Sequence, residues 1–209
     1  MRMIRKIILL LTLCLTFGGA FAQNFNQAQA LKEISEAAAS IKTMQCDFVQ
    51  TKSLKMLGDK MISKGQMWCE QPNMLRWQYN SPYTYTFILN NNKVAIRKGN
   101  HSDLIDVNKN KMFKEIARIM MNSVLGKVLT DKADFKSSVT QKGGYYIVTL
   151  LPQKKEMKQM FTSILLYYDT KLKLVTKVEM HEKNGDSTLI ELKNIKKNTP
   201  INASQFKVN

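Results

Sequence analysis

The stretch that decides the fold covers residues 65–82 and reads GQMWCEQPNMLRWQYNSP. Two runs of strand-forming residues, 66–70 and 75–79, are separated by Pro72-Asn73. Proline has a fixed φ and no backbone N–H, so this dipeptide belongs in the turn of an antiparallel hairpin. Each run carries one tryptophan among polar neighbours, which is the alternation of a half-buried sheet. The two indoles are expected either to fill an ordinary core or to line the wall of a ligand cavity.

Strand patterns continue along most of the chain. The expected strands cover residues 45–53, 62–70, 75–79, 83–89, 93–97, 101–107, 135–141, 145–151, 161–169, 172–181 and 187–193, with a short edge strand at 204–208. Asn90-Asn91-Asn92 and Gly143-Gly144 are signals of tight hairpin turns. About eleven short strands joined by short turns predict one antiparallel sheet that curls towards a barrel.

Two segments have helical periodicity instead. Asn26, followed three residues later by Gln29, resembles a capping box at the start of an amphipathic helix over 27–43. Residues 110–129 repeat apolar side chains at helical spacing and include several methionines, which can repack around ligands of different shapes. This second helix is expected to be either an ordinary core helix or a lid over a hydrophobic cavity.

The N-terminus has the layout of a secretory signal peptide. Three basic residues within the first six precede an apolar run, 7–17, and Ala20-Phe21-Ala22 follows as a small-x-small cleavage site. The run is too short to anchor the chain across a bilayer. Residues 1–22 are therefore expected to be removed, leaving a single exported domain at 23–209. Cys14 lies in the apolar run without small residues before it, so no lipid anchor is expected.

The mature chain is strongly basic, with 29 Lys and Arg residues against 16 Asp and Glu, a net charge of +13. Such a charge usually indicates an anionic surface or partner. Export argues against nucleic acid, and the lysines are spread along the chain in ones and twos. Much of the charge is therefore interpreted as solvated surface, with an attraction to membranes as its functional aspect.

Two cysteines, Cys46 and Cys69, remain after cleavage. They would face each other in a hairpin centred near Leu57-Gly58. Export permits a disulfide, but directly opposed strand positions strain the bridge geometry, so two free, buried thiols are equally compatible with the sequence.

The residues do not suggest catalysis. In His101-Ser102-Asp103, adjacent strand residues point to opposite faces and cannot form a triad. His181 is expected to face solvent. The sequence has no metal-ligand spacing, glycine-rich phosphate loop or placed pair of carboxylates. A non-enzymatic binding protein without cofactor or metal is predicted.

Several motifs together resemble the LolA-type periplasmic outer-membrane lipoprotein carrier family. They are, in order, Phe48-Val49-Gln50-Thr51, Gly65-x-x-Trp68, Pro72-Asn73, Arg76-Trp77-x-Tyr79-x-x-Pro82 and the closing Phe206. The resemblance implies an α+β fold, a half-open antiparallel β-barrel of about eleven strands with helices forming a lid over an apolar cavity.

The resemblance also implies a function. A monomeric carrier would take the acyl chains of lipoproteins from an inner-membrane release complex, cross the periplasm, and hand them to an outer-membrane acceptor, with transient contact with membrane surfaces. A general periplasmic binder of lipids, glycolipids or other hydrophobic ligands is the alternative. The residues expected along the cavity are Phe48, Trp68, Leu75, Trp77, Phe87, Leu89, Met112, Ile116, Ile119 and Met120.

One position departs from the family pattern. Members often carry an arginine just before the motif proline, where it ties the barrel to the lid, whereas this chain has Gln71. An amide can donate a hydrogen bond but cannot make a charge-assisted contact. Lid control is therefore assigned to Gln71, with Arg76 as a basic residue that could substitute.

Overall fold

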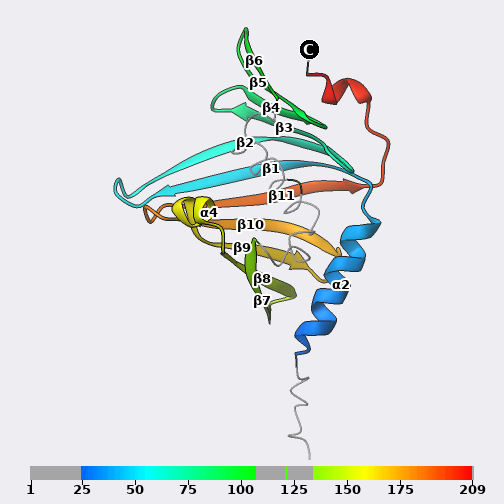
Figure 1. The fold of residues 1–209 in the computed structure, drawn as a ribbon, viewed down its shortest axis with the longest axis vertical. Helices are drawn as coiled ribbons and strands as arrows, with labels where there is room; N and C mark the ends of the chain where they lie inside the picture. Colours follow the sequence, from blue (N-terminus) through cyan, green and yellow to red (C-terminus); the bar gives the residue numbers. More distant parts are fainter. Residues whose placement is uncertain (1–24, 107–120, 122–133, 209) are drawn as a thin grey trace, which may run out of the picture.

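The computed structural model describes residues 25–106, 121 and 134–208, and its main element is one antiparallel sheet (Figure 1). The strands are β1 (Thr43–Leu54), β2 (Asp59–Glu70), β3 (Met74–Ser81), β4 (Tyr85–Asn90), β5 (Lys93–Lys98), β6 (His101–Asp106), β7 (Phe135–Lys142), β8 (Tyr145–Pro152), β9 (Phe161–Asp169), β10 (Leu174–Glu182) and β11 (Ser187–Lys197). The described helical segments are α2 (Gln27–Ser40), α4 (Lys155–Met160) and the 3-10 helix η3 (Ala203–Phe206).

The strand order brings the first and last strands of the chain together at the centre of the sheet. One meander runs from β1 to β6 and a second from β7 to β11, and β1 pairs with β11 to join them. Within the described residues, β6 and β7 form the two edges, so the sheet is open. The predicted antiparallel sheet of eleven strands is confirmed. The predicted helix at 110–129 lies outside the described residues apart from Met121.

One face of the sheet is apolar across most of its width, and we call it the inner face. It carries Met44, Cys46 and Phe48 of β1, because alternate strand residues point the same way. Two clusters of buried residues lie on it. The first comprises Ile41, Met44, Cys46, Phe48, Met67, Cys69, Leu75, Trp77, Phe87, Leu89, Val94, Met121, Leu174 and Leu192. The second comprises Ala30, Ile34, Phe135, Val139, Val148, Leu150, Met157, Ile164, Leu166, Tyr168, Val175 and Val178.

Helix α2 packs on the second cluster. The Gln29 backbone N–H donates to Asn26 Oδ1 at 3.1 Å, so the predicted N-cap is confirmed. The buried residues of the helix are Ala30, Ile34 and Ala38. Their small or slender side chains let α2 lie close to β7 and β10, the strands that it contacts.

Two expectations about elements were wrong, and one short helix was missed. The N-terminal helix ends at Ser40 rather than at residue 43, because Ile41 is already extended and β1 begins at Thr43. The segment 204–208 is not an edge strand; it begins within η3, which lies against β3 and β4 and buries Phe206. Helix α4 was not predicted, because six residues are too few to show a period.

The centre of the sheet is organised by a glycine. Gly65 of β2 pairs directly with Phe48 of β1. A Cβ at residue 65 would overlap the backbone carbonyl oxygen of Gln78 and lie 2.5 Å from Phe48 Cζ. The Phe48 ring therefore rests on the space that the missing side chain leaves, and this contact requires glycine.

We expect Gly65→Ala to lower the free energy of unfolding by about 2 kcal/mol or more, because the added methyl group overpacks a buried site bounded by backbone. Denaturant unfolding measures the change. Ser63→Ala, at a half-buried position on the same strand, is the control and should shift stability by less than about 0.5 kcal/mol. Equal stability of Gly65→Ala and the parent chain would contradict this account.

The register of the β1–β2 hairpin separates the two cysteines. Cys46 pairs with Met67, and Cys69 pairs with Met44, so the predicted direct opposition of the cysteines was wrong. The observed turn, 55–58, is centred between Met56 and Leu57, one residue before the predicted centre, and this shifts the register by two positions. Cys46 and Cys69 are both buried, and neither forms a disulfide. The Cys69 Sγ lies 3.9 Å from the Met121 Sδ.

Stability is expected to fall as the pH rises above about 9. Burial, with smaller contributions from the charges of Asp47 and Cys69, raises the pKa of the Cys46 thiol from 9.0 to about 12. Between these values the unfolded chain loses a proton that the folded chain keeps, so alkali favours unfolding. Burial also raises the pKa of Tyr167 and Tyr168 from 10.0 to about 12. The loss of stability that these two tyrosines cause therefore begins about one pH unit above the loss caused by Cys46.

Comparison of the parent chain with Cys46→Ala isolates the thiol. Denaturant unfolding at pH values from about 8 to 10 should show a shallower loss of stability in the variant. Equal slopes for the two proteins would contradict the assignment to Cys46.

Candidate functional site

Five of the predicted cavity residues meet on the inner face. Phe48, Leu75, Trp77, Phe87 and Leu89 all belong to the first cluster and are buried. The Phe48 ring stacks on the Trp77 ring with centroids 4.3 Å apart, and Tyr79 meets Phe48 edge-on at 5.2 Å. These contacts form an aromatic wall across β1 and β3. The four cavity residues predicted on the second helix lie outside the described residues; they are Met112, Ile116, Ile119 and Met120.

Trp68 does not share this wall, so its prediction as a cavity residue was wrong. The β2–β3 register pairs Trp68 with Arg76, and Trp77 with Met67. Directly paired residues of antiparallel strands point to the same face, which places the two tryptophans on opposite faces. Trp68 is half-buried on the outer face, where the Arg76 guanidinium carbon lies 5.8 Å from the centre of its ring.

The two residues assigned to lid control have different surroundings. The Gln71 side-chain amide donates to the Ile41 carbonyl, and its backbone N–H donates to the Lys42 carbonyl at 2.9 Å. Gln71 therefore ties the β2–β3 turn to the connection between α2 and β1. The Arg76 guanidinium instead donates to Gln78 Oε1 at 2.6 and 3.0 Å, and to the Gln205 carbonyl at 3.4 Å.

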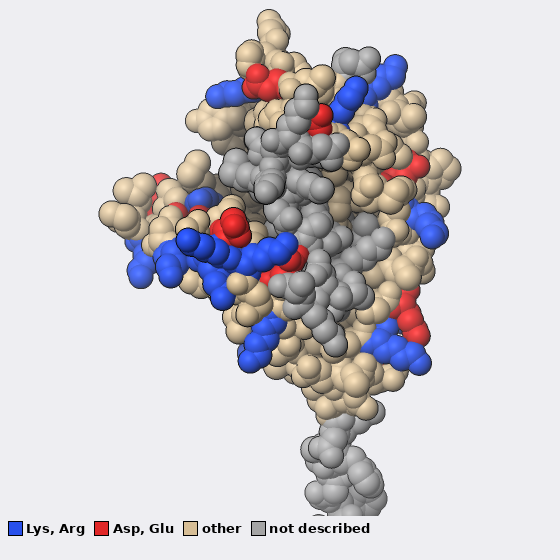
Figure 2. Space-filling view, in the orientation of Figure 1, with Lys and Arg blue, Asp and Glu red and all other residues tan. Residues whose placement is uncertain are grey.

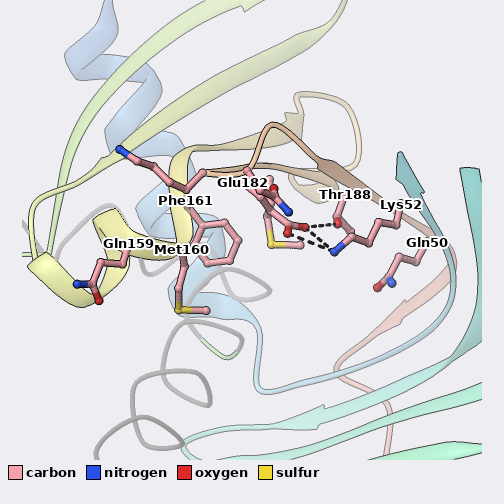
Figure 3. Close-up of a pocket in the computed structure, with 10 residues that line it drawn as sticks. Gln50, Lys52, Gln159, Met160, Phe161, Glu182 and Thr188 are labelled. Carbon is pink, nitrogen blue, oxygen red and sulfur yellow. Dashed lines mark hydrogen bonds and ion pairs between the residues drawn. The ribbon is translucent and has the colours of Figure 1, made fainter. Parts of the chain in front are cut away.

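A hollow of about 690 Å³ opens on the inner face where β1, β10 and β11 approach α4 (Figure 3). Its lining residues are Gln50, Lys52, Gln159, Met160, Phe161, Met180, Glu182, Lys183, Asn184 and Thr188. Figure 3 shows Phe161 and Met160 on one side, and the polar groups of Lys52, Glu182 and Thr188 on the other. The hollow thus joins an apolar side to a polar side.

The polar side is held by an ion pair. Lys52 Nζ lies 3.1 Å from Glu182 Oε1 and 3.2 Å from Oε2, and the Thr188 hydroxyl donates to Oε1 at 3.1 Å. Asp186 Oδ2 lies 3.9 Å from the same ammonium group. Next to this network, the Tyr79 hydroxyl donates to Gln50 Oε1 at 2.9 Å, and burial raises the pKa of Tyr79. These bonds fix polar groups at the boundary of the aromatic wall.

The change from apolar to polar side chains on the inner face follows the sequence of β1. Its inward-facing residues run Met44, Cys46, Phe48, Gln50 and Lys52, so every second residue becomes polar after Phe48. This alternation could have predicted a polar end to the cavity. The partners of Lys52 could not have been found in the same way, because Glu182 and Asp186 are 130 or more residues away in the sequence.

The described residues show no catalytic arrangement around this site. His101 Nε2 lies 3.0 Å from Asp103 Oδ1, but both side chains are exposed on β6 and Ser102 points to the opposite face. No group of three His, Cys, Asp or Glu residues in the described ranges is placed to hold a metal ion. None of the described helices is both long and apolar enough to span a membrane.

Comparison with known proteins gives results that agree with this fold. The family described as outer membrane lipoprotein carrier protein LolA matches residues 39–209. An outer-membrane lipoprotein carrier protein of Francisella tularensis subsp. tularensis (strain WY96-3418) is 25% identical over 202 residues, which is 97% of this chain and 91% of that protein.

Solved structures extend the comparison. A chain in the Pseudomonas aeruginosa MucA/MucB complex matches with a TM-score of 0.52 and 13% identity, covering 87% of this chain and 60% of that one. A crystal structure of MucB matches with a TM-score of 0.51 and 11% identity, covering 88% of this chain and 62% of that one. Both share the fold, and this chain spans about three fifths of their length. With the family match over residues 39–209, the chain belongs to the LolA family of outer membrane lipoprotein carrier proteins.

Proposed function

We propose that this chain is a non-enzymatic periplasmic carrier that binds the acyl chains of lipoproteins on its inner face. It would receive them from an inner-membrane release complex and deliver them to an outer-membrane acceptor. Removal of residues 1–22 as a signal peptide would leave the carrier domain at 23–209. Family membership supports the carrier class, and the similarity to the Francisella tularensis carrier runs through nearly the whole chain.

The observation that carries the proposal is the hollow beside the aromatic wall. Acyl chains leaving a bilayer expose apolar surface at a cost of about 25 cal/mol per Å², so a carrier must cover them. The hollow, at about 690 Å³, has the size of a ligand site, and Met160, Phe161 and Met180 supply flexible or aromatic surface. Such adaptable contacts favour release as well as binding.

The polarity of the site suggests how the ligand lies. The acyl chains would contact Met160, Phe161 and Met180 and continue towards the wall around Phe48. The polar end of the lipoprotein would lie near Lys52 and Glu182, whose charges already satisfy each other. A neutral ester or amide could therefore bind there without separating an unpaired charge from water.

Fully buried wall residues are poor probes of binding. Leu75 is 0% exposed, so a charge there would unfold the sheet rather than report on the ligand. Half-buried residues at the margin of the first cluster are better suited. Ile96 of β5 packs against that cluster, whereas Leu104 of β6 is exposed on the opposite face.

We expect Ile96→Glu to reduce the capture of acylated lipoprotein about tenfold or more, because a carboxylate would be placed in an apolar contact. The mature protein is incubated with membranes that carry newly made lipoproteins, and the soluble fraction is tested for the complex. Leu104→Glu adds the same charge on the other face and should leave capture unchanged.

Two outcomes would change this account. Equal capture by Ile96→Glu and the parent chain would remove Ile96 from the contact surface. If the parent chain yields free lipid but no acylated protein in its soluble complex, the protein is a general binder of lipids or other hydrophobic ligands.

The role proposed for Gln71 has its own test. In Gln71→Glu a carboxylate would face the Ile41 carbonyl in place of an amide donor, which should cost about 1–3 kcal/mol of stability. If the residue controls access to the inner face, the variant should also release bound lipoprotein faster, and Gln71→Arg, which restores a donor, should not. Asn73→Asp places the same charge at an exposed position of the turn and serves as the control. A loss of stability with unchanged release would assign Gln71 a structural role only.

A further inference from the structure

The hairpin tip, defined here as residues 54–62, projects beyond the sheet (Figure 1). β1 pairs with β11 only as far as Ser53, and β2 pairs with β3 only from Lys64 onwards. In the described residues, the segment 59–63 of β2 therefore pairs with β1 alone. The tip is the part of these two central strands that neighbouring strands do not cover.

The tip is apolar where it is most exposed. Met56 is 94% exposed and Leu57 is 74% exposed, and they are adjacent at the turn. Met61 and Ile62 follow on β2, and both are also exposed. A folded domain seldom leaves several large apolar side chains of one short segment in water unless another apolar phase covers them.

Lysines surround this apolar group. Lys55 is the first residue of the turn, and Lys60 and Lys64 follow on β2. The single acidic residue of the tip, Asp59, accepts a hydrogen bond from the Lys60 backbone N–H at 2.7 Å. The same end of the sheet carries Lys155 and Lys158 on α4, and Figure 2 shows basic side chains gathered in this region.

We propose that the hairpin tip docks the protein on anionic bilayers. Met56 and Leu57 would insert at the boundary between headgroups and acyl chains, while the lysines contact lipid phosphates. The projecting side chains of Met56 and Leu57 are suited to insertion into the deformable acyl-chain region of a bilayer. The positive charge of the surrounding lysines is complementary to an anionic lipid surface.

Docking in this way would bring the hollow to the bilayer. The Lys55 backbone N–H donates to Asp186 Oδ1 at 2.9 Å, and the Lys55 side chain lies against Gly185. Gly185 and Asp186 belong to the turn between β10 and β11. The same turn contains Lys183 and Asn184 and directly follows Glu182, and these three residues line the hollow. This orientation rests on the proposed carrier function, whereas bilayer binding by the tip does not depend on it.

Vesicle partition of the mature, ligand-free chain tests the proposal. The parent chain should bind vesicles of phosphatidylcholine mixed with phosphatidylglycerol, and bind phosphatidylcholine alone more weakly. The double variant Met56→Ser/Leu57→Ser should partition at least about tenfold less. Lys55→Gln should partition about fivefold less, and added salt should remove that difference.

The β9–β10 turn provides a matched control. Leu172, in this turn, is 54% exposed and lies between Lys171 and Lys173. The turn joins β9 and β10 at the end of the sheet opposite the hairpin tip (Figure 1). Leu172→Ser should bind vesicles like the parent chain. A fluorophore attached at Leu57→Cys should report an apolar environment when vesicles are added, because Cys46 and Cys69 are buried and do not compete for the label.

Equal partition of the parent chain and the double serine variant would overturn the proposal, as would an equal loss in Leu172→Ser. Binding that does not respond to phosphatidylglycerol would also overturn it. Retention of a bound lipoprotein is measured separately, without vesicles. If the parent chain fails to retain lipoprotein but its tip still binds vesicles, the carrier function fails and the docking surface stands.

Discussion

The contact between the Phe48 ring and the backbone of Gly65 is the constraint on which the rest of the structure depends. The ring can lie flat on β2 only because residue 65 has no side chain. From there it stacks on Trp77 and meets the edge of Tyr79. One aromatic residue thus links β1, β2 and β3 at the centre of the sheet, and a slip of one residue would turn it to the outer face.

The order and type of most strands could be predicted because their turns carry strong local signals. Pro72-Asn73 and Gly143-Gly144 both lie where the chain reverses. Register was harder, since it depends on the position on which each turn is centred. The four-residue turn at 55–58 separated Cys46 from Cys69, and the β2–β3 register placed Trp68 away from Trp77. Alternation within one strand cannot reveal these relations, because they are properties of strand pairs.

The inner face combines a rigid part with an adaptable one. The wall around Phe48 and Trp77 is fully packed, so it holds the shape of the sheet. The hollow beside it has Met160 and Phe161 on one side and the Lys52–Glu182 ion pair on the other. A carrier needs both properties, because a rigid surface keeps the site formed without ligand and an adaptable one accepts ligands of different lengths.

The pairing of β1 with β11 has a consequence for folding. Met44 lies opposite Lys197, so the central seam of the sheet joins residues about 150 positions apart in the chain. Contacts of this range form slowly, because a long loop must be closed before any pairing energy is gained. The sheet cannot be completed until almost the whole chain has been synthesised. An export route that transports unfolded chains would therefore receive this protein before β1 and β11 have paired.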